Sequence, residues 1–532
     1  MPQPVLPSID ERFSHLLNGN YPLEPLEVAS IQDAIETETL AIAKLQLAIS
    51  KLQQEVTERE SKRKAYESFL SPLRRGFLPQ EILGEIFSFA LGLPGKLTSD
   101  SNELKRLCLV CKSWRYAALA RPALWATVSL YARTEHPPDM EKVRRWMQRS
   151  GTVPKKLAIR DFGVHCNDYS EGKPCPLAFQ GLAAFLANGP ALDELSLEGR
   201  SDKCLEQLID LVKRDQLNTN TPVQPWGTVR SLALGMKEFQ SSETQSSWRV
   251  IHDLPPMTSL SITFPTLYCD STELLPDRPL PFTGLTNLTL QCDWPIMWIL
   301  TNLENCHKLE KLVLDAAQVY RRTPDTFDAQ AKPILLPKLR TLHFRHMISS
   351  SLDTQILQRL RMPSLERIDL EFNAGDSEID DFPEDDSSRQ NLFLDFKAMT
   401  QGVNCVSSLQ TLRLGEEFGI SSPGLLRILK LFPSLVNLIF DNLSSDPDLF
   451  ERAGRTKSLL PRLRTLEIND GYSDFNPDDV CAYLIKRKDS ATEEAPDYFE
   501  ELIISTEFQG PHNADESADK LRRRGVRVDI EI

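Results

Sequence analysis

The sequence lacks the features that would place it in a membrane or outside the cell. No apolar run reaches the roughly 20 residues that a membrane-spanning helix needs. The first residues, MPQPVLPSIDERF, show no basic start followed by an apolar core, so we expect no secretory signal. The ten cysteines follow no disulfide-framework spacing, which is typical of a reducing compartment. We therefore expect a cytoplasmic and/or nuclear protein.

An excess of basic residues is also missing. The chain has 61 Lys and Arg against 75 Asp and Glu, which gives a net charge of −14 and a sequence pI near 5.3. An acidic surface disfavours non-specific binding to nucleic acids and to anionic membranes. We therefore expect neither a nucleic acid nor a membrane among the partners.

Motifs of catalysis and metal binding are absent too. The sequence contains no G-x-S-x-G, H-E-x-x-H or G-x-G-x-x-G. Cys108 and Cys111 form a single C-x-x-C without the second pair of a zinc site, and the cluster of His165, Cys166 and Cys175 is isolated. We expect no catalytic residues, no cofactor and no metal. An enzyme whose site is assembled from distant residues stays an alternative.

The most informative stretch that is present spans residues 78–125. Pro79 suits a first helical turn, and apolar residues follow at helical spacing. A second helical pattern runs from Leu104 to Ala117, and Pro122 ends it. Such a short unit has little core of its own, so it cannot bury all of its apolar side chains, among them Leu78, Ile82, Ile86 and Phe87. Exposed apolar surface of this kind indicates a binding site for a partner.

This stretch resembles the F-box. The resemblance is carried by Leu78-Pro79, Glu81-Ile82-Leu83, Ile86-Phe87, Leu107, Val110-Cys111, Trp114, Pro122 and Leu124-Trp125. The segment from Leu91 to Glu103 is longer than the usual link between the first two helices. The resemblance implies docking to the Skp1 adaptor of cullin-based (SCF) ubiquitin ligases through Leu78, Pro79, Ile82, Leu83, Ile86, Phe87, Leu107, Val110, Trp114, Pro122 and Trp125. The alternative is a helix-turn-helix fragment of an ordinary domain.

A long helix is predicted ahead of this stretch. Residues 1–25 are Pro-rich and expected to be flexible, whereas residues 26–75 follow a heptad pattern. One seam position holds Val28, Ile35, Ile42, Ile49 and Val56, and the other holds Ile31, Leu45 and Leu52. Glu38 interrupts the second row, and Arg59 and Arg63 end the seam. A parallel coiled-coil homodimer through residues 26–75 is one interpretation. A single helix that folds back on the rest of the chain is the other.

A repeated Leu-x-x-Leu-x-Leu unit fills the remainder of the chain. Copies begin at Leu192, Val229, Met257, Leu285, Leu309, Leu339, Leu365, Leu409, Leu435 and Leu463, with degenerate copies at Pro154 and Phe499. Helical patterns lie between many copies, so each unit reads as a strand plus a helix that must stack on its neighbours. The array resembles the irregular leucine-rich repeats of fungal F-box proteins. An acidic insertion is expected at residues 371–390.

These patterns together predict an α/β chain of four parts. They are a flexible N-terminus (1–25), a long helix (26–75), a small all-α F-box (76–126) and an irregular leucine-rich-repeat solenoid (127–532). In the solenoid we expect a parallel sheet on the concave side and helices on the convex side.

Charged residues of both signs are expected at the middle of the concave side. Residues that alternate with the core leucines face this side, and here they include His343, Arg345, Arg367, Asp369 and Arg413. One interpretation is a binding site for a target protein with an acidic or phosphorylated segment. The other is that Asp369 and Glu371 neutralise these bases across the sheet.

The expected function is that of a substrate-recognition subunit of an SCF-type ubiquitin ligase. Its partners would be a Skp1-like adaptor, through that adaptor a cullin, and an unknown target protein. The chain itself would act by proximity, because it raises the effective concentration of the target near the conjugating enzyme. An F-box scaffold acting outside a ligase is the alternative.

Overall fold

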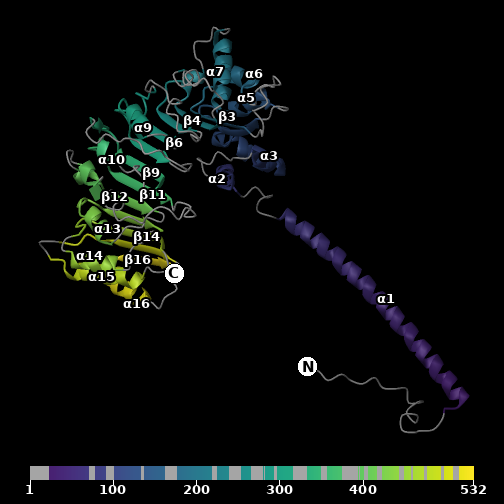
Figure 1. The fold of residues 1–532 in the computed structure, drawn as a ribbon. Coiled ribbons are helices and arrows are strands. Elements are labelled where there is room, and N and C mark those ends of the chain that lie inside the picture. Colours follow the sequence, from purple (N-terminus) through teal and green to yellow (C-terminus); the bar gives the residue numbers. More distant parts are fainter. Residues whose placement is uncertain are drawn as a thin grey trace.

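The computed structural model joins a long helix, a small helical module and a curved parallel sheet (Figure 1). The structure describes residues 23–70, 78–91, 101–132, 137–161, 177–217, 225–238, 253–264, 280, 282–292, 296–315, 332–348, 356–373, 393–394, 396–400, 405–415, 422–442, 448–456, 459–471, 476–492, 496–506 and 514–531. The expected flexible N-terminus lies almost wholly outside these ranges, as do residues 71–77.

Helix α1 (Pro25–Phe69) is the long helix that the heptad pattern predicts. It begins with Pro25 in its first turn, and the Glu24 backbone N–H donates to the Glu27 carboxylate over 3.0 Å. Its second half carries intrahelical ion pairs such as Arg59–Glu55 at 3.1 Å. None of its residues is buried, and it points away from the sheet (Figure 1). The interpretation of a helix folded back on the rest of the chain is therefore wrong.

The helical module comprises residues 78–91 and 101–125. It contains α2 (Gln80–Ala90), α3 (Ser101–Val110), α4 (Lys112–Leu119) and a 3-10 turn, η2 (Pro122–Trp125). They enclose a small core of Leu83, Phe87, Leu104, Ala117, Ala118 and Trp125. The second helical pattern, Leu104 to Ala117, is divided between two helices, α3 and α4. Cys111 separates them with an extended backbone (φ −161°, ψ 171°).

Most of the described strands after the module form one parallel sheet of 14 strands, which follow one another in sequence order. They are β1 (Thr127–Ala132), β2 (Lys156–Asp161), β3 (Glu194–Ser201), β4 (Ser231–Glu238), β5 (Ser259–Thr263), β6 (Asn287–Gln291), β7 (Lys311–Asp315), β9 (Thr341–Ile348), β11 (Arg367–Asn373), β12 (Thr411–Gly415), β13 (Asn437–Asp441), β14 (Thr465–Gly471), β15 (Glu501–Thr506) and β16 (Arg527–Glu531). A separate pair joins β8 (Ile334–Leu335) to β10 (Leu360–Arg361). Each Leu-x-x-Leu-x-Leu copy predicted from the sequence supplies one strand of the large sheet.

Helices cover the outer side of the curved sheet (Figure 1). They are α5 (Met140–Gln148), α6 (Gln180–Asn188), α7 (Asp202–Leu217), α9 (Ile296–Leu303), α10 (Ile356–Arg359), α12 (Cys405–Ser408), α13 (Ser422–Leu429), α14 (Leu449–Arg455), α15 (Pro477–Asp489) and α16 (Ala514–Arg522), with a 3-10 turn η4 (Pro225–Thr228). This arrangement confirms the predicted α/β class with a solenoid-like parallel sheet. The inner, concave side carries no described helix.

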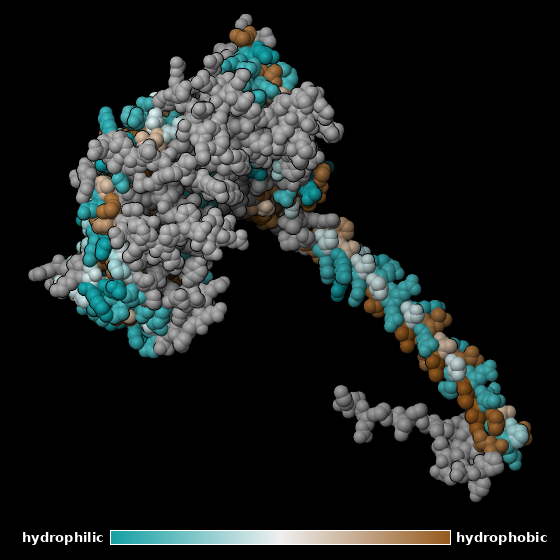
Figure 2. All heavy atoms as spheres, in the orientation of Figure 1, coloured by the Kyte–Doolittle hydropathy of each residue, from teal (hydrophilic) through white to brown (hydrophobic). Residues whose placement is uncertain are grey.

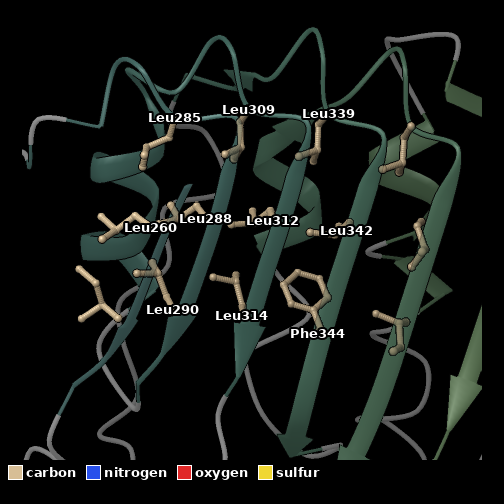
Figure 3. Packing of buried hydrophobic residues seen from close by; sticks show 14 of the residues in the cluster. Leu260, Leu285, Leu288, Leu290, Leu309, Leu312, Leu314, Leu339, Leu342 and Phe344 are labelled. Carbon is tan, nitrogen blue, oxygen red and sulfur yellow. The ribbon is translucent and has the colours of Figure 1, made fainter. Parts of the chain in front are cut away.

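The core is a ladder of leucines between sheet and helices (Figure 3). Leu288, Leu312 and Leu342 occupy the same level of three neighbouring strands, and each is at most 1% exposed. Leu290, Leu314 and Phe344 form the next level (Figure 3). Each strand buries its alternate side chains only because the next strand lies beside it, so the units are stable only as a stack.

The acidic insertion begins later than predicted. The expected start, Glu371, lies within β11, which continues to Asn373, because the Glu371 carboxylate is paired with bases on neighbouring strands. Residues 374–392, which hold the rest of the insertion, lie outside the described residues. At the other end of the chain, where the alternating residues VRVDIEI predict a last strand, Arg527–Glu531 form β16.

Candidate functional site

The helical module presents an apolar face that its own core does not cover. Ile82 and Ile86 lie one turn apart on α2 and are 47% and 46% exposed. Phe89 at the end of α2, together with Leu109 and Val110 at the end of α3, is more exposed still. We call Ile82, Ile86, Phe89, Leu109 and Val110 the apolar face. An exposed group of large apolar side chains on so small a unit marks a binding surface.

The residues predicted to dock a partner divide into three groups. Pro79, Ile82, Ile86, Val110 and Pro122 are exposed, whereas Leu78, Leu107 and Trp114 are half-buried. Leu83, Phe87 and Trp125 are at most 3% exposed, so the expectation that they contact a partner directly is corrected. They belong to the module core; Leu83 and Phe87 each follow Ile82 and Ile86 by one residue and are therefore turned about 100° away from them around α2.

Sequence reasoning missed Phe89 and Leu109 as members of the apolar face. Phe89 lies three residues after Ile86 and seven after Ile82, so helical spacing could have found it. Leu109 lies outside the apolar pattern of α3, and only its size could have marked it. Tyr116 and Leu119 on α4 are exposed in the same way.

A tilted contact between two indole rings joins the module to α5. The ring centroids of Trp125 in the module and Trp146 in α5 lie 4.6 Å apart. The Arg149 guanidinium carbon lies 4.5 Å from the centroid of the Trp125 ring. The Lys105 ammonium lies 5.8 Å from the centroid of the Trp146 ring. The Trp125 indole N–H donates to the Ala118 carbonyl over 2.7 Å. These contacts hold the apolar face at a fixed orientation to the sheet.

A second candidate surface lies on the concave side of the sheet. Four neighbouring strands, β9, β11, β12 and β13, bring together His343, Arg345, Asp369, Glu371, Arg413 and Asp441, which we call the charged cluster. Glu371 is its centre. Its Oε1 lies 2.9 Å from His343 Nε2 and 2.9 Å from Arg413 Nη1, and its Oε2 lies 3.8 Å from Arg345 Nε.

Two further acids, Asp441 and Asp369, pair with bases on these strands. Arg413 also donates to Asp441, and the Arg367 Nε–H donates to Asp369 over 2.9 Å. All five residues predicted for a target site are thus brought to one region of the sheet. The ion pairs are those that the alternative interpretation expected, in which acids neutralise the bases across the strands.

A bulge in β9 adds a residue to this region. The register of β9 against β11 shifts between Leu370 and Phe372, so that Arg345 and His346 together face Glu371. His346 has a left-handed backbone (φ 53°), which is uncommon for a residue with a side chain. Its Nδ1 lies 2.9 Å from an Asp315 carboxylate oxygen. Neither His346 nor Asp441 was predicted from the sequence.

Burial and ion pairing shift the pKa values of two residues in the charged cluster, His343 and Arg413. His343 is only 6% exposed, and this burial lowers its pKa below 6.5, although Glu371 and Asp369 act in the opposite direction. For Arg413, burial acts to lower the pKa, but the hydrogen bond and charge of Asp441 together with the charges of Glu371 and Asp369 outweigh it and raise the pKa. The cluster therefore favours a neutral imidazole among paired ions.

The described residues contain no group of three or more His, Cys, Asp or Glu side chains placed to hold a metal ion. Cys108 is half-buried and Cys111 is exposed, whereas the cluster of His165, Cys166 and Cys175 lies outside the described residues. Within the described ranges, no helix combines the length and apolar character needed to cross a membrane.

Comparison with known proteins identifies the helical module. A family model described as F-box-like matches residues 76–131, roughly a tenth of the chain. The chain therefore contains an F-box-like domain, which covers the module and runs into β1. No curated protein matches the sequence.

Among solved structures, a chain from the crystal structure of the Rad7 and Elc1 complex in yeast is similar over 81% of this chain and 92% of its own length. The two sequences are 13% identical and the TM-score is 0.27. A similarity this weak supports no conclusion about the fold or the function of this chain.

Proposed function

We propose that the chain is the substrate-recognition subunit of an SCF-type (Skp1–cullin–F-box) ubiquitin ligase. The observation that carries this proposal is the F-box-like domain with an apolar face left outside its core. In this proposal the chain is a non-catalytic adaptor, and ubiquitin transfer takes place on other subunits. Its contribution is to hold a target protein close to the conjugating enzyme.

A Skp1-like adaptor is the proposed occupant of the apolar face. Ile82 and Ile86 would enter the adaptor's surface side by side, with Val110 from the end of α3 beside them. Leu83, Phe87 and Trp125 would contribute indirectly, because they hold α2 and α4 in place. Large apolar side chains that become fully desolvated at the centre of an interface commonly contribute about 2 kcal/mol or more each.

The concave side is the proposed surface for the target. The side chains of Arg345 in the charged cluster and of Arg367, which pairs with the cluster residue Asp369, stay 45% and 41% exposed, so they can add bonds to an incoming carboxylate or phosphate. His343 and Asp369 are buried beneath them. A target segment with acidic or phosphorylated residues would have to draw Arg345 from Glu371, to which it lies at 3.8 Å, and this weak pair costs little to separate.

The Skp1 interaction is tested with full-length protein and purified Skp1. The double variant Ile82→Asp/Ile86→Asp should lose Skp1 binding while its thermal unfolding stays close to that of the parent, because both side chains are exposed in the chain alone. Leu217→Asp is the matched control, since Leu217 at the end of α7 is an exposed leucine far from the apolar face. Unchanged Skp1 capture by the folded double variant would refute the docking surface.

Binding of a cullin distinguishes a ligase subunit from an F-box scaffold that acts outside a ligase. Reconstitution of the chain with Skp1 and a cullin should give a ternary complex that elutes as one species. If Skp1 binds but the cullin does not join, the chain acts outside a ligase, and the ubiquitin-ligase part of the proposal fails while the Skp1 part stands.

A further inference from the structure

Helix α1 exposes an apolar seam along most of its length. Its members are Ile35, Ile42, Leu45, Ile49, Leu52 and Val56, and each is more than half exposed. Figure 2 shows apolar residues on the surface of the helix from end to end. An isolated helix in water gains no stability from such a seam, and most helical stability in proteins comes from covering an apolar stripe.

We propose that a second copy of α1 covers the seam in the antiparallel direction. In the register that we infer, Ile49 faces Leu52 of the second copy and Leu45 faces Val56 of the second copy. The two-fold axis then passes between Ser50 and Lys51. In every layer a residue from the heptad row of Ile49 meets a residue from the heptad row of Leu52, as antiparallel helix pairs require.

The charged residues of the seam favour the antiparallel direction. Glu38, Arg59 and Arg63 occupy seam positions. A parallel dimer in register would place each of them against its own copy, which gives three layers of like charge. In the antiparallel register Glu38 faces Arg63 of the second copy, and symmetry forms this opposite-charge layer twice. Arg59 lies against Ile42, where its aliphatic stem can pack while its charged end reaches water.

The residues that flank the seam also favour the antiparallel direction. In a parallel dimer, Glu55 would neighbour Glu60 of the second copy, which is a repulsive contact between flanking positions. In the antiparallel register Glu55 lies beside Ala48 and Lys62 lies beside Ala41, so no like charges meet at these positions. The small alanines also allow the two helices to approach closely.

Charge along the whole helix points in the same direction. The first part of α1, Pro25–Leu40, contains four acids and no base, namely Glu27, Asp33, Glu36 and Glu38. Near the other end the bases Arg59, Lys62, Arg63 and Lys64 are interspersed with the acids Glu55, Glu58, Glu60 and Glu67. Only residues 61–69, which face the acidic first part in this register, keep a net positive charge, with three bases and one acid. Among the described residues Glu38 has no ion-pair partner, and the second copy supplies one. The β-branched and leucine pattern alone favours a parallel dimer, but it does not include these charges.

Sedimentation velocity of the full-length chain over a range of concentrations tests the direction. The parent should show a reversible dimer. Glu38→Arg and Arg63→Glu each turn both opposite-charge layers into like-charge layers, so each should raise the dissociation constant about tenfold or more. The double variant Glu38→Arg/Arg63→Glu restores the opposite charges and should return close to the parent value. Glu36→Arg and Lys64→Glu make the same charge changes outside the seam and should have little effect.

The seam itself is tested by substituting two apolar residues of α1 that are similarly exposed in the single chain. Ile49 and Leu47 are 54% and 60% exposed, but only Ile49 lies in the seam. Ile49→Gln should weaken the dimer more than tenfold, whereas Leu47→Gln should not, with helix content checked for both by circular dichroism. A parent that stays monomeric at every concentration overturns the proposal. Single charge variants that dimerise as the parent does would show a parallel dimer and also overturn it.

Discussion

The indole rings of Trp125 and Trp146 pack with their centroids 4.6 Å apart and their planes inclined by 56°. Trp125 ends the F-box-like module, and Trp146 belongs to the first helix of the solenoid. This pair therefore joins the two parts of the chain directly. A rigid joint matters for the proposed function, because the distance between a bound target and the rest of a ligase depends on it.

Loss of this aromatic pair should uncouple the two parts. Trp146→Ala removes the ring that covers Trp125 and should lower the stability of the module by about 3 kcal/mol. Calorimetry should then show the module unfolding in a separate transition at lower temperature than the sheet. Trp146→Phe keeps an aromatic ring against Trp125 and should keep the transitions coupled. A single unchanged transition for Trp146→Ala would show that the joint lies elsewhere.

Truncation in the leucine ladder should be costly at any strand of the sheet. Leu312 is fully buried between Leu288 and Leu342, so Leu312→Ala should lower the free energy of unfolding by about 2–5 kcal/mol. Denaturant unfolding followed by circular dichroism measures this change. Lys311→Ala on the same strand is the control, because Lys311 is exposed. Equal effects of the two variants would contradict the ladder.

Acidification should weaken the fold through His343. Burial lowers its pKa below the ordinary value of 6.5, so the unfolded chain binds the proton more readily than the folded chain. The free energy of unfolding therefore falls as the pH drops below 6.5. In His343→Gln this contribution is absent, and urea unfolding between about pH 7.5 and pH 5.5 should show a smaller loss of stability. His307→Gln removes an exposed imidazole and serves as the control.

Two thiols should be protected in the folded chain. Burial raises the pKa of Cys306 and of Cys481 to about 12, and both side chains are inaccessible. Iodoacetamide at neutral pH should therefore label the exposed Cys111 and leave these two unmodified until denaturant is added. Mass spectrometry of the digested protein gives the labelling at each site. Rapid native labelling of Cys306 would mean that the helix-covered side of the sheet opens locally.

The sequence predicted most of the strands because their leucines alternate over many copies. It predicted the helical module for the same reason, since the apolar periodicity of α2 is strong. The break at Cys111 escaped prediction, because Val110 and Trp114 keep helical spacing across it while the backbone between them is extended. Periodicity reports which face is apolar, but it does not report a local change in backbone direction.

The charged cluster was found only in part for a related reason. Strand alternation placed His343, Arg345 and Asp369 on one face, as observed. The bulge at His346 depends on one left-handed residue, which no composition signal marks. Asp441 escaped notice because its pairing with Arg413 depends on the register between strands that lie 28 residues apart.

The order of the strands in the sheet has a consequence for synthesis of the chain on the ribosome. From β1 to β16 every strand of the large sheet pairs with neighbours that precede or follow it directly in that sheet's sequence order. No strand must wait for a later one to be inserted between it and its partner. Each unit can therefore dock on the previous one as soon as it leaves the ribosome, and of the two edges of the growing sheet only the one at the newest strand has to accept further strands.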